Sequence, residues 1–327
     1  MEFEKDLIFP IRSPEEFHEK ALQIFRYQYH GNRVYRTFCD HLSTTPNKVS
    51  DLEDIPFLPI EFFKSKKIVV GNSNPEITFM SSGTTGAATS KHHVLDLPLY
   101  EESFLRAFEL FYGPITDYCI LALLPSYLER KGSSLIYMAD TLIKTSNHPK
   151  SGFYLANLND LKNQLISLQD DKKKVLLIGV SFALLDLAQI IDFPLKNTIV
   201  METGGMKGRR KEMIRSELHS VLKAAFGLAY IHSEYGMTEL LSQAYSNGKG
   251  IFNCPPWMNI LIRDTEDPLS YQTFHKTGGI NIIDLANVHS CSFIATQDLG
   301  KRFPNGSFEV MGRFDHADVR GCNLMVL

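Results

Sequence analysis

Short apolar runs alternate with helical patterns through the middle of the chain, and this alternation limits the fold more than any other feature of the sequence. The apolar runs are YCILALLP (118–125), KVLLIGV (174–180) and NTIVMETGG (197–205). Each adjoins a stretch with helical spacing, namely LIYMADTLI, FALLDLAQII and KEMIRSELHSVLKAAF. Strands that alternate with helices build largely parallel sheets with helices on their faces. The pattern therefore predicts an α/β fold.

The two ends of the chain differ from this central pattern. Ser13 precedes a proline and two acidic residues, which is typical of a helix start, so we expect an amphipathic helix over 13–30. The proline-punctuated segment 54–70 is expected to be an irregular connector that ends in a strand. After Cys254 the segments GGINIIDL, CSFIAT and SFEVMGR predict a β-rich subdomain.

Composition excludes several classes of protein. The 327 residues are 44% hydrophobic and carry a formal net charge of -3, which predicts a globular protein without a nucleic-acid footprint. Five scattered cysteines without a CxxC pair indicate a reducing compartment. The acidic start MEFEKDLIFP does not resemble a secretory signal, and no run approaches the ~18 apolar residues of a membrane span. We therefore expect a cytoplasmic location.

The segment FMSSGTTGAATSKHHV (79–94) has the composition of a phosphate-binding loop. Glycines allow close backbone approach, successive N–H groups can enclose an anion, and the hydroxyl groups add donors. Lys91 adds a positive charge, whereas the GxxxxGK[ST] pattern of a Walker A loop does not occur. His92 and His93 alternate along a strand, so at most one faces the site, and His92 is the candidate. A polar hairpin turn is the alternative interpretation of this segment.

Four further polar clusters follow along the chain: METGGMKGRR (201–210), HSEYGMTE (232–239), ATQDLG (295–300) and GRFD (312–315). Tyr235 can stack on a base, Thr238 can donate to a phosphate, and Glu239 offers the hard oxygen ligand that Mg²⁺ prefers. Asp298 follows a strand pattern, where a carboxylate can accept from ribose hydroxyl groups. Each cluster alone has an ordinary structural explanation, but the ordered set is much harder to explain in that way.

In this order, SSGTTG, GGMKGRR, EYGMTE, TQDLG and GRFD resemble the core motifs of adenylate-forming enzymes, the superfamily of acyl-CoA synthetases and luciferases. Within it, IPFLPIEFFKSKKI, IFRYQYHGNRVYRTFC, LLPSYLERKGSSLIYM and the closing RGCNLMVL are similar to the acyl-protein synthetase, LuxE-like branch. The resemblance covers nearly the whole chain.

The resemblance implies a role for each motif residue. The triphosphate would be covered by Ser81, Ser82, Gly83, Thr84, Thr85 and Gly86. The adenine would be flanked by Gly204, Gly205 and Tyr235, with Met206, Gly236 and Met237 in the same nucleotide-binding segments. Thr238 would contact the α-phosphate, and Glu239 would hold Mg²⁺. Asp298 and Arg313 would take the ribose, and Asp315 would be the hinge between half-reactions.

The implied fold is the large N-terminal domain of the superfamily, with mixed, largely parallel sheets flanked by helices and a β-rich subdomain. We expect this domain over 1–312, with an N-terminal helical extension over 1–70, and a hinge and short C-terminal stub over 313–327. The chain continues for 12 residues after Asp315, so most of the mobile C-terminal domain of the superfamily has no counterpart here. That domain supplies a lysine for adenylation, so we expect that Lys91 or another base substitutes for it, that a partner chain completes the site, or that adenylation is slow.

The implied reaction uses ATP to convert a carboxylic acid, in this branch a fatty acid, into acyl-AMP and then transfers the acyl group to a thiol. Cys322, five residues from the C-terminus and near Arg320, is the candidate acceptor, because a cation favours the thiolate. A small hydrophobic role for Cys322 is equally compatible with the sequence. An internal thiol makes CoA an optional cofactor beside ATP and Mg²⁺. The expected partners are the acid and an acyl reductase or acyl-carrier protein.

Three alternatives stay open. A CoA ligase of the phenylacetate type would need a CoA site, and a non-catalytic remnant would bind nucleotide without releasing pyrophosphate. In a serine hydrolase, Gly179, Ser181 and the following helix would form a nucleophile elbow, although Ala183 replaces its second glycine. The hydrolase interpretation leaves the other motifs unexplained.

Overall fold

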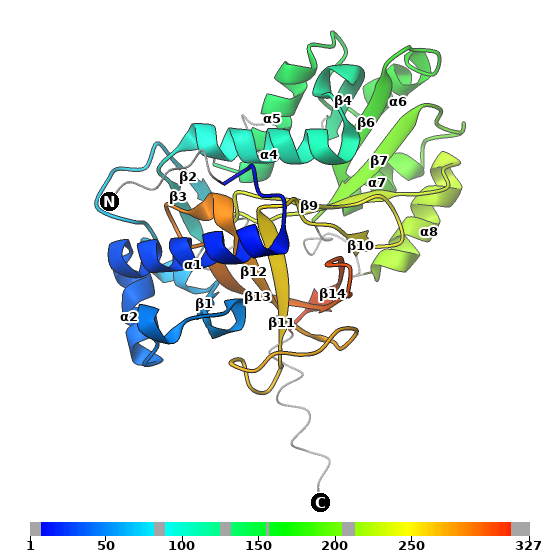
Figure 1. Cartoon of the computed structure of the whole chain (residues 1–327). Helices are drawn as coiled ribbons and strands as arrows, with labels where there is room; N and C mark the ends of the chain where they lie inside the picture. The colour runs from blue at the N-terminus through cyan, green and yellow to red at the C-terminus, as the bar shows by residue number, and fades with distance from the viewer. Residues whose placement is uncertain (1–7, 82–88, 125–131, 155–156, 205–212, 315–327) are drawn as a thin grey trace, which may run out of the picture.

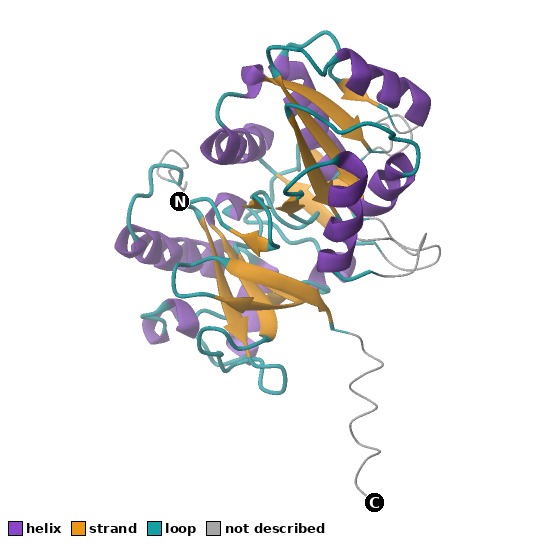
Figure 2. Cartoon of the chain, turned by 90° about the vertical axis from the view of Figure 1, so that its right-hand side faces the viewer, coloured by secondary structure: helices purple, strands orange, loops and turns teal. Residues whose placement is uncertain are grey.

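The strands of the described residues form two six-stranded sheets and a separate two-stranded sheet. The computed structural model describes residues 8–81, 89–124, 132–154, 157–204 and 213–314. Each large sheet lies in its own lobe of the molecule, and helices pack against it (Figures 1 and 2). The chain therefore positions its polar motifs around the junction of two sheets.

The first large sheet is the predicted parallel one. Its strands lie in the order β5 (Gly152–Phe153), β4 (Tyr118–Leu123), β6 (Lys174–Val180), β7 (Thr198–Thr203), β8 (His232–Tyr235) and β9 (Ala244–Ser246). The pairings from β5 through β8 are parallel, and β9 is antiparallel to β8. Every residue of β4 is buried, as expected where helices cover both faces of a parallel sheet. The α/β prediction is confirmed.

The helices of this lobe lie on both sides of the parallel sheet (Figure 2). They are α4 (Leu97–Tyr112), α5 (Ser134–Ser146), α6 (Leu158–Ser167), α7 (Ser181–Ala188) and α8 (Arg215–Phe226). The stretches with helical spacing in the sequence correspond to α5, α7 and α8. The βα alternation read from the sequence is therefore present in this lobe.

The second large sheet confirms the β-rich subdomain. Its main strands lie in the order β10 (Ile251–Phe252), β14 (Phe308–Arg313), β13 (Phe293–Arg302), β12 (Gly278–Asp284) and β11 (Met258–Arg263), with antiparallel pairing throughout. A short 3₁₀ turn, η5 (Leu285–Asn287), follows β12. The separate two-stranded sheet pairs β2 (Ile77–Met80) with β3 (Lys91–Val94).

The expected connector over 54–70 differs from the structure in its ending. It contains a short strand, β1 (Leu58–Pro59), and a helical turn, α3 (Phe62–Ser65), but no strand at its end. β1 pairs in parallel with β13, so this early segment completes the β-rich sheet. The final residues bond to a loop instead, because Val70 N–H donates to His289 O and Ser290 Oγ donates to Ile68 O. The prediction of a terminal strand is wrong for this reason.

The N-terminal helices α1 (Pro14–Gly31) and α2 (Arg33–His41) pack against the β-rich lobe (Figure 1). As predicted, Ser13 caps α1 by accepting from Glu16 N–H at 3.2 Å. Tyr35 stacks on Phe293 of β13 with ring centroids 6.1 Å apart. An aromatic pair of this kind adds about 1 kcal/mol to the effect of its buried area.

One buried amide fixes α1 to the β-rich lobe. Gln28 Nε2 donates to Asn287 O and Val288 O at 3.0 and 2.9 Å, and Gln28 Oε1 accepts from Ser292 N–H at 3.0 Å. The side chain is fully buried. Its loss would leave several polar backbone groups unpaired in the interior.

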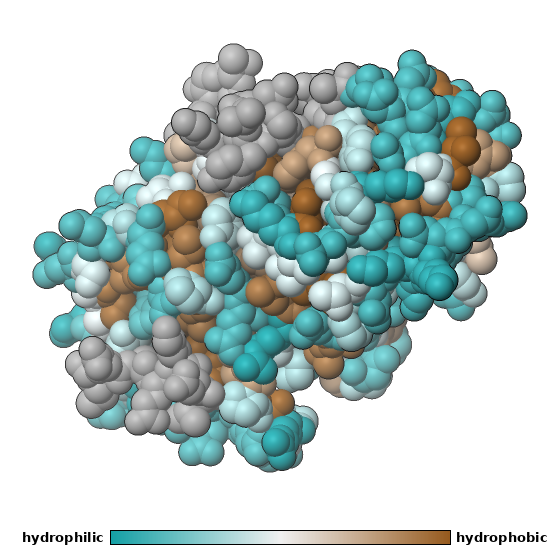
Figure 3. Space-filling view, turned by 90° about the horizontal axis from the view of Figure 1, so that it is seen from above, coloured by the Kyte–Doolittle hydropathy of each residue, from teal (hydrophilic) through white to brown (hydrophobic). Residues whose placement is uncertain are grey.

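Within the described parts of the chain, no helix has the length and apolar character needed to cross a membrane. Seen from above, hydrophilic residues cover most of the surface, and hydrophobic residues appear in small groups between them (Figure 3).

We predict that Gln28→Leu lowers the free energy of unfolding by about 2–4 kcal/mol, because the apolar side chain leaves buried donors and acceptors without partners. Gln23→Leu on the exposed side of the same helix is the control and is expected to change it by less than about 0.5 kcal/mol. Urea unfolding followed by circular dichroism measures both. Equal effects of the two substitutions would contradict the anchoring role of Gln28.

Candidate active site

Two of the polar motifs lie at the carboxyl ends of neighbouring parallel strands, β7 and β8, where ligands bind in open α/β sheets. The strands are paired so that Thr203 lies opposite Glu234, and Thr203 Oγ1 donates a hydrogen bond to the Glu234 carboxylate. Gly204 directly follows β7 with φ of 68°, a conformation that glycine adopts without strain. The turn after each strand is therefore built around a glycine and buried polar groups.

Gly236 permits a close approach of a side chain that a Cβ atom at this position would have to displace. A Cβ atom at this position would lie 2.3 Å from Glu234 Oε1 and 3.2 Å from Gln243 Cγ. The Glu234 side chain folds over the backbone of Gly236. Glu234 is buried, and Gly236 is partly buried.

A three-residue cluster joins the two large sheets. Tyr235, the last residue of β8, donates from its hydroxyl group to Asp298 Oδ2 at 2.7 Å. Arg313 of β14 donates from Nε to Asp298 Oδ1 at 3.1 Å. Asp298 and Arg313 face each other in the β13–β14 ladder, next to a register shift after Leu299. Three residues from three of the predicted motifs therefore meet at one carboxylate.

The exposure of these three side chains differs. The Asp298 side chain is 11% exposed and the Arg313 side chain is 74% exposed, and Tyr235 as a whole residue is 8% exposed. Burial, followed by the negative charge of Asp298, raises the pKa of Tyr235 well above its usual value. The Tyr235 ring packs against Phe252 and Phe308 at centroid distances of 5.9 and 5.6 Å. The cluster thus has a rigid, neutral phenol on one side and a solvent-facing guanidinium on the other.

Glu239 lies beside the base of the hairpin that carries the SSGTTG segment. Ser81 N–H donates to Ser90 O at 3.0 Å, and Ser90 N–H donates to Ser81 Oγ at 2.9 Å, which closes the hairpin. Glu239 is 5% exposed, and burial raises its pKa. A hydrogen bond with the Ser90 side chain and the charges of Arg313 and Lys64 oppose this rise. Ser90 therefore links Glu239 to the base of the hairpin, and Arg313 acts on the same carboxylate.

Lys91 opens β3 opposite Met80 and is exposed. Side chains alternate along a strand, so Lys91 shares a face with His93 and lies on the face opposite His92. His93 bonds through Nδ1 to Thr78 Oγ1 at 2.9 Å. The hydrogen bonds of the described residues do not connect Lys91 with Glu239.

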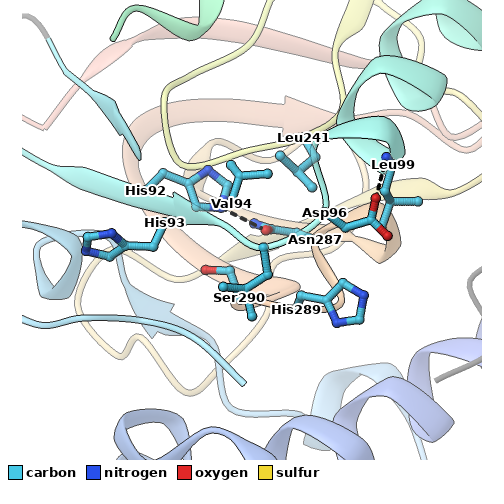
Figure 4. A pocket seen from close by; sticks show the side chains of 10 residues that line it. His92, His93, Val94, Asp96, Leu99, Leu241, Asn287, His289 and Ser290 are labelled. Carbon is cyan, nitrogen blue, oxygen red and sulfur yellow. Dashed lines mark hydrogen bonds between the residues drawn. The ribbon is translucent and has the colours of Figure 1, made fainter. Parts of the chain in front are cut away.

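His92 points into the protein from the other face of β3 (Figure 4). Its Nδ1 lies 2.8 Å from Thr238 O, and its Nε2 lies 3.0 Å from Asn287 Oδ1. The ring is fully buried, and burial lowers its pKa to about 4, so it is neutral at pH 7. Thr238 O can only accept, so Nδ1 carries the single proton of the neutral ring, and Nε2 faces Asn287 Oδ1 without donating to it. Neither nitrogen is accessible, so His92 is not the free catalytic base that a site-facing histidine would be.

Ser181 does not have the environment of a nucleophile. It begins α7, is 2% exposed, and donates from Oγ to Gly204 O at 2.6 Å. A nucleophile elbow holds its serine exposed and beside a histidine. Here the hydroxyl group instead fixes the turn after β7.

Several predicted site residues lie outside the described residues. They are Ser82, Gly83, Thr84, Thr85, Gly86, Gly205, Met206, Asp315 and Cys322. Of the predicted residues that are described, Ser81, Gly204, Tyr235, Gly236, Met237, Thr238, Glu239 and Arg313 lie on strand ends and loops around the sheet junction. Asp298 lies within β13, so its predicted place at a strand end is wrong, because β13 continues to Arg302 in its ladder with β14.

Two buried polar residues of this region were not singled out from the sequence. Asp284 Oδ2 accepts from Leu241 N–H at 2.8 Å and Ser242 N–H at 3.0 Å, and Asn287 Nδ2 donates to Glu239 O at 2.8 Å. The sequence feature that could have identified them is the presence of two polar residues inside the otherwise apolar run IIDLANV. The strand predicted from GGINIIDL includes Asp284 and ends before Asn287.

No group of three or more His, Cys, Asp and Glu side chains in the described ranges is arranged to hold a metal ion. A magnesium ion that travels with a nucleotide needs fewer protein ligands, because phosphate oxygens and water complete its coordination. The single buried carboxylate of Glu239 beside the hairpin fits that second kind of site.

Comparisons with solved structures define the class of fold. ATP-bound MatB from Rhodopseudomonas palustris is similar over 75% of this chain and 49% of its own, with 16% identity and a TM-score of 0.55. An open conformation of 2-hydroxyisobutyryl-CoA ligase, in complex with 2-HIB-AMP and CoA, is similar over 92% of this chain and 70% of its own, with 12% identity and a TM-score of 0.70. This chain spans about half the length of MatB. The fold is that of adenylate-forming enzymes.

Within that class, sequence relatives indicate the branch. The family model "Acyl-protein synthetase, LuxE" matches residues 12–102. The long-chain-fatty-acid–luciferin-component ligase of Vibrio harveyi is 24% identical over 92% of this chain and 84% of its own length. The protein of the same name from Photorhabdus luminescens is 34% identical over 20% of this chain and 57% of its own. Together the comparisons support the LuxE-like branch, which confirms the resemblance seen in the motifs.

We predict that Gly236→Ala lowers the free energy of unfolding by about 1–3 kcal/mol, because the added methyl group would displace the buried Glu234 side chain. Gly152→Ala is the matched control, since its Cβ would meet its nearest neighbour, in the Tyr154 ring, at an ordinary 3.7 Å. Chemical denaturation measures both variants. A Gly236→Ala protein as stable as Gly152→Ala would show that this close approach is unimportant.

Proposed function

We propose that this protein uses ATP to activate a carboxylic acid, a long-chain fatty acid in the first instance, as acyl-AMP and then transfers the acyl group to a thiol. The observation that carries the proposal is the meeting of Tyr235, Asp298 and Arg313 from different sheets, beside the loop that bears Glu239. The names of the curated relatives and the ATP-bound state of the MatB structure support it.

In this proposal the nucleotide lies across the junction of the two sheets. The segment Ser81 to Gly86 covers the triphosphate, and the adenine lies between the segment Gly204 to Met206 and the segment Tyr235 to Met237. Asp298 and Arg313 bind the ribose. Asp298 already accepts two hydrogen bonds, and a carboxylate has lone pairs for about four, so ribose hydroxyl groups can be added without breaking either bond.

The chemistry requires two anions to approach each other. The substrate carboxylate attacks the α-phosphorus of ATP, the bond to the bridging oxygen breaks, and pyrophosphate leaves with that electron pair. Thr238 and the N–H groups of the 81–86 segment stabilise the charge that develops on the phosphate oxygens, and Lys91 supplies a further positive charge. Glu239 holds Mg²⁺, which when bound offsets phosphate charge.

The acyl group then passes to a thiolate sulfur, and AMP leaves with the electrons of the broken carbon–oxygen bond. The described cysteines are poorly suited to this role, because burial raises the pKa of Cys119 to about 11 and those of Cys39 and Cys254 to about 12, and also raises that of Cys291. This elimination favours Cys322 as acceptor, with Arg320 nearby in sequence.

The domain assignment is part of the same proposal. Residues 1–312 form the adenylation domain with its N-terminal extension over 1–70, and 313–327 form the hinge, at Asp315, and the stub. A reducing, cytoplasmic compartment suits the unpaired cysteines of the described chain. An acyl reductase or an acyl-carrier protein is the proposed partner.

The alternatives differ in what they require. A CoA ligase would transfer the acyl group to CoA, and a remnant would bind ATP without chemistry. The buried Ser181 hydroxyl group, which is bonded to a backbone carbonyl, weighs against a hydrolase.

We predict acid-dependent exchange between ATP and labelled pyrophosphate, measured over a panel of fatty, aromatic and short-chain acids. Asp298→Asn is expected to raise the KM for ATP about 10- to 100-fold, because it removes the charge that takes the ribose hydroxyl groups. Glu309→Gln is the control, since Glu309 belongs to the next ion pair of the same β13–β14 ladder, with Lys301 at 2.8 Å. Binding of ATP without exchange for any acid would favour the non-catalytic alternative.

We predict that Cys322→Ser retains pyrophosphate exchange but loses covalent labelling by a radioactive fatty acid in the presence of ATP. The reason is that the serine hydroxyl group is a much weaker nucleophile than a thiolate at neutral pH. Cys254→Ser is the control and should keep the label. Labelling that requires added CoA and persists without Cys322 would instead support the CoA ligase.

A further inference from the structure

The loop that carries Thr238 and Glu239 is held by buried side chains from two other parts of the chain. His92 Nδ1 lies 2.8 Å from Thr238 O, and Asn287 Nδ2 donates to Glu239 O at 2.8 Å. His92 and Asn287 also contact each other, with His92 Nε2 3.0 Å from Asn287 Oδ1, as the dashed line in Figure 4 shows. Both side chains are fully buried.

The contacts form a bracket around Glu239. Thr238 O belongs to the peptide group between residues 238 and 239, and Glu239 O belongs to the peptide group between residues 239 and 240, so the two side chains hold the peptide groups on both sides of the Glu239 Cα atom. Asn287 has its orientation set by Glu239 O, since only its amide N–H₂ can donate there. Its Oδ1 therefore faces His92 Nε2, which carries no proton in the neutral ring, so the approach between these two atoms is a contact and not a hydrogen bond.

A second anchor fixes the residues that follow. Asp284 accepts from Leu241 N–H, Ser242 N–H and Ser242 Oγ at 2.8, 3.0 and 2.6 Å. Asp284 and Asn287 lie at the two ends of the turn η5, so the β-rich sheet holds the loop at two points. His92 adds a third attachment, from the hairpin that carries the SSGTTG segment.

This arrangement excludes other roles for the histidine. A catalytic base must reach the substrate with a free ring nitrogen, whereas both nitrogens of His92 contact protein oxygens and the ring has no exposed surface. A role in filling space alone does not explain a histidine at this position. An apolar side chain would fill the same volume without the free-energy cost of burying polar nitrogen atoms.

We propose that His92 and Asn287 are positioning residues that hold the peptide groups on both sides of Glu239, so that the Thr238 and Glu239 side chains meet the nucleotide in the correct geometry. The functional half of this proposal rests on the proposed function, because it assigns Thr238 and Glu239 to the phosphate and to Mg²⁺. Its structural half, that the bracket fixes the loop, does not depend on any substrate.

Hydrogen–deuterium exchange of the protein without ligand tests the structural half. The amides of Leu240, Leu241 and Ser242 bond to Met237 O and Asp284, so their exchange reports opening of the loop. We expect His92→Ala and Asn287→Ala to accelerate this exchange about tenfold or more, while α6 in the parallel-sheet lobe keeps its wild-type rate. His93→Ala, at the neighbouring position on the opposite face of β3, should leave the loop within about twofold of wild type.

Two conservative variants separate positioning from loss of volume. Asn at position 92 has a donor near the place of the ring Nδ1, so His92→Asn should restore much of the loop protection through Thr238 O. His92→Leu keeps volume but no donor, and should behave like His92→Ala. If His92→Ala does not fold, these two variants carry the comparison. Equal loop protection in His92→Leu and the wild type would overturn the proposal.

Pyrophosphate exchange tests the functional half. We expect His92→Ala and Asn287→Ala each to lower kcat about 10- to 100-fold with a smaller change in the KM for the acid, because displacement of catalytic groups by about 1 Å costs about that much. The double variant should be no slower than the slower single variant by more than about threefold, since the two residues act as one unit. Additive losses, or losses in KM alone, would contradict a joint positioning role.

The two measurements keep the proposals apart. Absence of acid-dependent exchange in the wild-type protein would refute the proposed function, and the deuterium exchange of the loop would still decide whether the bracket exists. Wild-type rates of pyrophosphate exchange in a variant whose loop amides have lost protection from deuterium exchange would refute the functional half alone.

Discussion

Hydrogen bonding of buried polar groups at the junction of the two large sheets is the constraint on which the rest of this structure depends. Strands β7 and β8 of the parallel sheet end in turns at Gly204 and Gly236. The segment after Tyr235 then leaves the parallel sheet and contacts residues of the β-rich sheet. A loop in this position carries backbone donors and acceptors that water cannot reach. Asp284, Asn287 and His92 satisfy them, so a loop that would otherwise be costly to bury becomes a fixed platform.

Buried hydrogen bonds also join the N-terminal helix α1 to the rest of the molecule. Gln28 binds the backbone at 287, 288 and 292, directly after the turn that carries Asp284 and Asn287. The turn η5 is therefore held from one side by α1 and itself holds the 238–242 loop on the other. The family model matches residues 12–102, and in this structure α1, within that range, supports the segment beneath the candidate site. An N-terminal region that looked like an extension in the sequence thus contributes to the architecture of the site.

The positive and negative charges of the candidate site differ in their exposure to solvent. Arg313 is exposed and extends toward solvent from the rim, while Glu239 and Asp298 are largely buried. The pKa of Glu239 is raised by burial, and positive charges from Arg313 and Lys64 oppose that rise. A buried carboxylate with a raised pKa gains from any further cation, which is the physical basis of the Mg²⁺-binding role proposed for Glu239.

Local sequence signals predicted the local structure well. Apolar runs and helical spacing gave β4, β6 and β7 with their helices, and the Ser13 cap gave the start of α1, because strand and helix periodicity depends on residues close together in the chain. The error at 66–70 has the opposite cause: Val70 and Ile68 are apolar enough for a strand, but their backbone partners are His289 and Ser290, more than two hundred residues later. The sequence could not show which edge or loop would be available to them.

By itself, then, the sequence determined the α/β class, the order of the motifs and the resemblance to adenylate-forming enzymes of the LuxE-like branch. Only the tertiary structure decided that Tyr235 and Arg313 share Asp298, that Ser181 is bonded to a backbone carbonyl, and that His92 faces Thr238 and Asn287 instead of a substrate. The physical reason is that the role of a polar side chain depends on its burial and its hydrogen-bond partners. For His92 those partners lie 146 and 195 residues away, and the packing of the two sheets brings them together.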